Sequence, residues 1–270
     1  MARMRHLIAG AAGLLVAAAA AAHDTWFEAL PREQGAGGVA IALGTGNRFP
    51  MQETPISAEH LVAAGCRGRT GEVIALRAAQ ARANALWLRS TVAPEAQPSC
   101  WAQVAPVDIT LPPAIVAVYL REVNAPASVR EAWAAQQARG VAWQERYTKH
   151  ARIEWLRTDA ATTTQPAPLD MDVLLRSDAP IAVGVPLTLQ VLRNGQPVPG
   201  LAVELRSAQA SLGIWRLTDA QGRVDFAPPL AGRWLLRGTE LRRSTDRPDT
   251  WDSGFVTLAF DVAGAPLSGQ

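Results

Sequence analysis

Short apolar runs, separated by glycine, proline, asparagine and serine, fill most of the chain after residue 22. In the first half they predict β-strands near residues 25–30, 39–43, 72–76, 85–89, 101–104 and 115–120. Short runs punctuated by turn residues are typical of antiparallel sheets. The first half is therefore predicted to be a β-sandwich or barrel.

The pattern changes at residues 128–157, where alanines and charges surround widely spaced aromatic residues. Ser128, with Glu131 three residues later, forms a capping-box signature after Pro126. The pattern predicts a helical segment over about 128–157, interrupted or kinked at Gly140.

Residues 158–168 are polar and contain prolines, which is typical of a connection between domains. After them, strands are predicted near 170–176, 186–193, 201–206, 213–218, 223–226, 233–237 and 255–262. Seven short strands with hairpin signals such as Asn194-Gly195 have the rhythm of an immunoglobulin-like sandwich. We predict a mainly β protein of two β-sandwich-like domains, residues 23–160 and 168–263, with the helical segment ending the first and the immunoglobulin-like sandwich forming the second.

Residues 1–22 have the order of a signal peptide. Arg3 and Arg5 precede an apolar run and then six alanines, and an Ala-x-Ala match places cleavage before His23, with neighbouring alanines offering sites one or two positions earlier. The apolar stretch of about 16 residues is shorter than the roughly 20 needed to span a bilayer. The sequence predicts a periplasmic or secreted protein with no membrane anchor after processing.

Charge argues against two classes of partner. The chain has 26 basic and 24 acidic residues, and loss of Arg3 and Arg5 brings the basic count to 26 − 2 = 24. Such a balance gives no field that attracts nucleic acid or anionic lipid. We expect no nucleic-acid partner.

Cys66 and Cys100 are the only cysteines. In an oxidising compartment an even count is read first as a disulfide. A two-thiolate metal site is the alternative, but no histidine or further cysteine lies at short ligand spacing from either residue.

Histidines are the candidate metal ligands. Cleavage before His23 would place a free α-amine and an imidazole on one residue, and together these can chelate a metal such as copper. Asp24 could add a carboxylate, while His60 and His150 could complete a nitrogen-rich site. The alternative is that His23 is only a polar residue left at the cut and that His60 and His150 are ordinary surface histidines.

Common catalytic motifs are missing from the sequence: it contains no Gly-x-Ser-x-Gly elbow, phosphate-binding glycine loop or His-Glu-x-x-His helix. Nine tryptophans could form a sugar-binding surface, yet several fall within predicted strands, where an indole is more often part of the core.

Three segments carry a resemblance to a known family. They are His23-Asp24-Thr25-Trp26-Phe27, the segment Gly44-Thr45-Gly46-Asn47-Arg48-Phe49-Pro50 followed by Glu53, and Tyr147-x-Lys149 within 145–151. With turn and strand segments of the second half, they resemble the NikM-like group of exported bacterial proteins, which is associated with nickel or cobalt uptake. The resemblance implies a periplasmic role in metal transport and a ligand role for His23.

The predicted function is therefore non-enzymatic: a periplasmic protein that binds copper or nickel through His23, Asp24, His60 and His150 and assists metal uptake or delivery. A membrane transporter or another periplasmic protein would be its partner. Two alternatives remain open at this point, a secreted adaptor without a metal role and a copper-dependent oxidase acting on glycans.

Overall fold

The computed structural model describes residues 23–31, 37–68, 71–93, 98–155, 162–177 and 179–265. The predicted signal peptide and part of the predicted linker lie outside these ranges. No helix within them is both long and apolar enough to cross a membrane.

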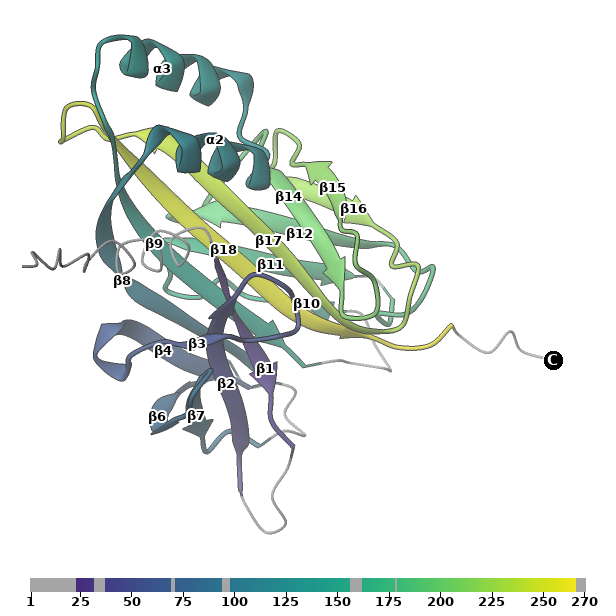
Figure 1. Cartoon of the computed structure of the whole chain (residues 1–270). Helices are drawn as coiled ribbons and strands as arrows, with labels where there is room; N and C mark the ends of the chain where they lie inside the picture. The colour runs from purple at the N-terminus through teal and green to yellow at the C-terminus, as the bar shows by residue number, and fades with distance from the viewer. Residues whose placement is uncertain are drawn as a thin grey trace, which may run out of the picture.

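A central sheet of eight strands organises the molecule (Figure 1). In spatial order its strands are β15 (Ile214–Leu217), β14 (Ala202–Ser207), β17 (Gly232–Arg243), β18 (Thr250–Val262), β9 (Trp143–Glu154), β8 (Ser99–Leu111), β4 (Leu61–Arg67) and β5 (Val73–Ala75). β18 pairs antiparallel with β17 and parallel with β9. Strands from both predicted domains therefore form one sheet.

Two smaller sheets accompany the central one. The N-terminal sheet contains β1 (Asp24–Ala29), β2 (Val39–Gly46), β7 (Leu86–Ser90) and β6 (Arg77–Ala81), with β3 (Thr54–Pro55) paired to β2. The C-terminal sheet contains β10 (Thr162–Thr163), β11 (Met171–Ser177), β12 (Leu187–Arg193) and β13 (Gln196–Pro197), with β16 (Arg223–Phe226) paired to β12.

The two smaller sheets cover opposite faces of the central sheet. Leu235 and Ala259 belong to the core shared with the N-terminal sheet, whereas their neighbours Leu236 and Leu258 belong to the core shared with the C-terminal sheet. Because successive side chains of a strand point to opposite faces, this division places one sheet on each side. The mainly β, sandwich-like fold predicted from the sequence is confirmed.

Two helices cover one end of the long strands (Figure 1). They are α2 (Pro113–Glu122) and α3 (Ala127–Ala138). Their buried side chains pack with Trp143, Trp251 and Phe255, and the rings of Trp143 and Trp251 stack with centroids 4.7 Å apart. A one-turn 3-10 helix, η1 (Ala58–His60), precedes β4.

Two secondary-structure predictions were wrong. The run 115–120, predicted as a strand, lies in α2, since Pro113 starts a helix whose apolar side faces the aromatic cluster. The predicted helical segment 128–157 is helical only to Ala138, and residues 143–154 form β9. Gly140 adopts a positive φ of 74° and ends the helix instead of kinking it.

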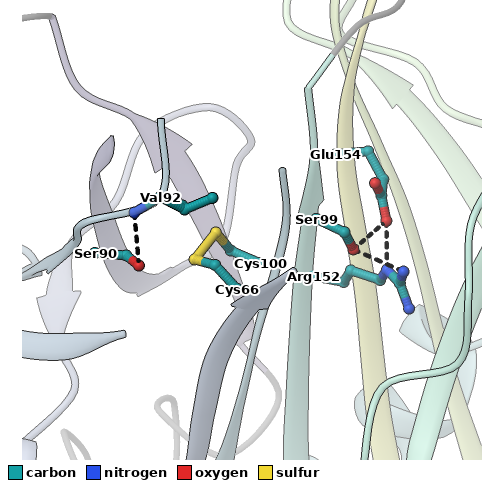
Figure 2. The surroundings of a disulfide bond; sticks show 7 residues. All are labelled: Cys66, Ser90, Val92, Ser99, Cys100, Arg152 and Glu154. Atoms are coloured by element: carbon teal, nitrogen blue, oxygen red, sulfur yellow. Dashed lines mark hydrogen bonds and ion pairs between the residues drawn. A yellow bond between two sulfur atoms is a disulfide. The ribbon is translucent and has the colours of Figure 1, made fainter. Parts of the chain in front are cut away.

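The predicted disulfide is present. Cys66 and Cys100 face one another on the neighbouring strands β4 and β8, with Cα atoms 4.0 Å apart (Figure 2). Both residues are completely buried in the core beneath the N-terminal sheet. The bond therefore fastens two strands of the central sheet inside a hydrophobic core.

Candidate functional site

His23 lies immediately before β1 and is joined to β9 of the central sheet through Lys149. Its side chain is only partly buried. Its backbone carbonyl accepts a hydrogen bond from the Lys149 Nζ of β9, with 2.9 Å between the atoms. The residue is thus held through its carbonyl, while its nitrogen atoms take no part in that contact.

Asp24 secures the first residue of β1. Its Oδ2 is 2.9 Å from Arg237 Nη1, and Arg237 also binds the Glu204 carboxylate at 2.6 Å. All three side chains are largely buried. In this conformation Asp24 anchors the strand through an ion pair, an arrangement that leaves it poorly placed to bind a metal.

The connection between β2 and β3 folds back over Trp26. Gln52 Nε2 donates to the Trp26 carbonyl at 2.8 Å, and the Phe49 ring meets the Trp26 ring edge-on with centroids 5.9 Å apart. A Cβ atom at Gly46 would lie 2.8 Å from the Trp26 ring, closer than side chains tolerate. The glycines of the Gly44-Thr45-Gly46 segment therefore allow this loop to close over the first strand.

Closure of the loop brings Glu53 toward His23. The Glu53 N–H donates to the Thr45 carbonyl at 2.8 Å, and Asn47 Nδ2 donates to Glu53 Oε2 at 3.3 Å. Thr45 belongs to β2, whose next residue, Gly46, pairs with Asp24. Glu53 is consequently separated from the start of β1 by one intervening strand, β2, and its side chain is exposed.

Lys149 forms the buried wall of the site. It is 4% exposed, and its Nζ lies 5.3 Å from the Tyr147 ring centroid and 5.8 Å from that of Phe255. Burial lowers the pKa of Lys149 to about 8, although Asp24 acts in the opposite direction. The three sequence segments that carry the family resemblance thus meet at one place.

Burial is also the largest influence on His23 and lowers the pKa of its imidazole below the ordinary value. Glu53 opposes this shift, Lys149 reinforces it, and Asp24 and Glu122 oppose it more weakly. The shift favours the neutral imidazole, which is the form that binds metals.

His60 and His150 occupy different surroundings. His60 ends η1 on the exposed surface. His150 follows Lys149 on β9 and therefore points to the opposite face, toward Asp170 and Asp172. Among the described residues, no group of three or more His, Cys, Asp or Glu side chains could hold a metal ion. The predicted site of three histidines is not assembled in this conformation.

His150 is a buried histidine, and its burial favours the neutral form. It is 2% exposed, and its Nδ1 lies 2.9 Å from the Phe255 carbonyl oxygen, which can only accept a hydrogen bond. Nδ1 must therefore carry the proton, and the buried Nε2 has no hydrogen-bond partner among the residues that the structure describes. Burial lowers the pKa of His150 in spite of the Phe255 carbonyl, Asp170 and Asp172, which all act to raise it.

This environment predicts a pH-dependent stability. Because the pKa of His150 is lower in the folded protein than in the unfolded chain, the unfolded chain binds more protons as the pH falls below about 6.5. The contribution of the neutral His150 to the free energy of unfolding is complete above that pH. It is lost on acidification, by at most about 1.4 kcal/mol per pH unit for one proton. In urea titrations between pH 7.5 and 5, H150Q should show a shallower loss of stability than the wild type.

H60Q is the matched control, since His60 is exposed. Its pH dependence should follow that of the wild type. If the free energy of unfolding falls equally steeply with pH in H150Q and in the wild type, His150 does not take up a proton on unfolding.

In the sequence, Lys149 and Glu53 stand out only as parts of the segments that carry the family resemblance. Lys149 is the only lysine in a chain of 26 basic residues, and it lies in the Tyr-x-Lys segment. Glu53 follows the glycine-rich segment by a few residues, and the folded loop places it near His23. Neither the single lysine nor the position of Glu53 points to a site near His23 in the sequence alone. Their proximity is visible only in the fold.

Comparison with known families gives one match. The family described as "Domain of unknown function (DUF4198)" matches residues 20–239, which is most of the chain and includes all three segments at the site. No curated protein matches the chain.

Proposed function

We propose that this chain, which belongs to the DUF4198 family, is an exported protein that binds copper or nickel through a processed N-terminal His23. In this proposal it works in the periplasm or outside the cell, where it captures the metal and assists its uptake or delivery. The NikM-like character of its three site segments supports a link to metal uptake, with a membrane transporter or another periplasmic protein as the recipient.

The observation that carries the proposal is the way in which His23 is held. Lys149 binds the carbonyl oxygen of His23, while the imidazole remains partly exposed. After cleavage before His23, the α-amine and Nδ1 of the same residue could close a chelate ring on one metal ion. Nitrogen ligands of this type suit copper and nickel.

Processing is essential to this chemistry. In the precursor the His23 nitrogen is an amide, which is a far poorer ligand than an amine. A free α-amine has an ordinary pKa of roughly 8, so a metal displaces its proton at little cost near neutral pH. Removal of the signal peptide would therefore create the site.

Titration calorimetry with Cu(II) and Ni(II) tests the proposal. The protein should be exported and processed in its host, and intact mass should confirm that it begins at His23. We expect binding of one ion per chain, with affinity reduced at least about 100-fold when a single alanine is inserted before His23, a loss equivalent to about 2.7 kcal/mol.

The inserted alanine leaves every described residue unchanged, so thermal unfolding of the metal-free variant should match that of the wild type. Equal affinity in the two proteins, or no binding in either, would contradict the proposal. An adaptor role without a metal would then be the better explanation.

A further inference from the structure

We infer that Glu53 supplies the third metal ligand, so that the loop between β2 and β3 closes the site. The inference rests on the proposed function, because it assumes that His23 provides the first two donors. The complete set would be the His23 α-amine, His23 Nδ1 and one Glu53 carboxylate oxygen. Such a mixed nitrogen and oxygen set suits Cu(II) or Ni(II).

Backbone pairing places Glu53 within reach. β2 lies between β1 on one side and β3 on the other, with Gly46 paired to Asp24 and Thr45 paired to Thr54. Neighbouring strands are about 4.8 Å apart, so the backbones of residues 23 and 53 are separated by about two strand spacings. The side chains of a histidine and a glutamate can span that gap.

Exposure favours Glu53 over Asp24, which is buried, as the carboxylate ligand. The Asp24 carboxylate is engaged by the buried Arg237. Glu53 is exposed and can rotate toward an ion without breaking a buried contact.

Asn47 gives the carboxylate its orientation. Its amide donates to Glu53 Oε2 at 3.3 Å, which leaves Oε1 available to a metal. Hydrogen bonds of this kind commonly orient ligating carboxylates and support metal affinity. Asn47 is thus a positioning residue for the ligand.

The arrangement explains why the glycine-rich segment and the N-terminal histidine occur together. Gly46 permits the loop to pack on Trp26, and the packed loop carries Glu53 to the first residue of the processed chain. Metal binding would join the loop to β1 and stabilise both.

Substitution of the two exposed carboxylates near His23 tests the inference. E53Q should lower Cu(II) affinity at least about tenfold. Substitution of residues that only hydrogen-bond to metal ligands already costs about 10–100-fold in affinity. E122Q is the matched control, because Glu122 is also exposed and also acts on His23, but from the end of α2. E59Q serves as a second control, because Glu59 is an exposed carboxylate in η1, the short helix that follows β3.

Two readouts besides affinity distinguish a ligand from a nearby charge. The electron paramagnetic resonance spectrum of the Cu(II) complex should change in E53Q and stay the same in E122Q and E59Q. Metal should also raise the melting temperature of the wild type more than that of E53Q. Both readouts use the processed protein and the metal ion alone.

The outcomes separate this inference from the function on which it rests. If E53Q matches the wild type while the alanine insertion abolishes binding, the Glu53 assignment is overturned and the terminal chelate stands. A larger loss in E122Q than in E53Q would also overturn the assignment. Absence of metal binding in every variant and in the wild type would overturn both.

Discussion

Replacement of Arg152 by methionine should lower the free energy of unfolding by about 3–5 kcal/mol, measured by urea or guanidinium titration. Arg152 is 1% exposed and binds the carboxylates of Glu154 at 2.5 Å and Asp172 at 2.7 Å. It also donates to Ser99 Oγ at 2.7 Å (Figure 2). Without the guanidinium, two buried carboxylates lose their countercharge, and that loss accounts for the expected cost.

The position of Arg152 makes this more than a local effect. Glu154 belongs to the central sheet and Asp172 to β11 of the C-terminal sheet, so one side chain joins two layers. R242M is the control, because Arg242 is 45% exposed on its side chain and pairs with Asp252 at 3.2 Å. An exposed pair contributes only about 0–1 kcal/mol.

The triple variant R152M/E154Q/D172N removes all three charges and should recover part of the lost stability. A loss in R152M no larger than that in R242M would show that the buried cluster does not join the sheets energetically.

The second large effect is expected from the disulfide. The double variant C66A/C100A should be less stable by roughly 3–4 kcal/mol, because the bond closes a loop of 34 positions and restricts the unfolded chain. The two sulfur atoms also fill space in a core where both cysteines are completely buried. Denaturant titration under non-reducing conditions measures the difference.

Wild-type protein unfolded in the presence of a reductant provides the comparison. Its midpoint should move toward that of the double variant, while a native sample exposed briefly to reductant should keep the bond because the sulfur atoms are buried. A double variant as stable as the oxidised wild type would show that strand pairing alone holds β4 and β8.

β9 shows why part of the fold could not be predicted. Its sequence places Glu145, Lys149, Arg152 and Glu154 in a segment that resembles an exposed, charged helix, yet all four side chains are buried. Their partners come from distant segments: Tyr119 and Ser253 hydrogen-bond to Glu145, and Asp172 pairs with Arg152. A local pattern contains no information about such partners, so it cannot show that these charged side chains are buried in a strand.

Most strands followed a simpler rule. Runs such as those in β2, β7 and β12 are apolar, short and bounded by turns, so periodicity and punctuation predicted them. The run 115–120 is apolar too, but length and pattern cannot separate a short strand from a buried helix. Contact with Trp143 and Phe255 decides in favour of the helix, and that contact is not local.

The candidate site was predictable only in part. His23 was identified because a histidine directly after the predicted signal-peptide cut would have special chemistry, which depends on its position in the chain. Glu53 and Lys149 become relevant through strand pairing and burial, neither of which a single sequence shows. The expectation that His60 and His150 would join His23 rested on residue type alone, and the two faces of β9 separate His150 from the site.

The place of β18 in the central sheet has a consequence for the order of folding. β18 is the last long strand of the chain, yet it lies between β17 and β9, with Thr250 beside Gln144 and Ala259 beside Ile153. A chain emerging from the ribosome presents β9 long before its neighbour exists, and β9 carries an unpaired edge until residues 250–262 arrive. Pairing between segments so distant is slow to form. Until then β9 has only one of its two neighbours, so the central sheet is complete only after the C-terminal strand has joined it.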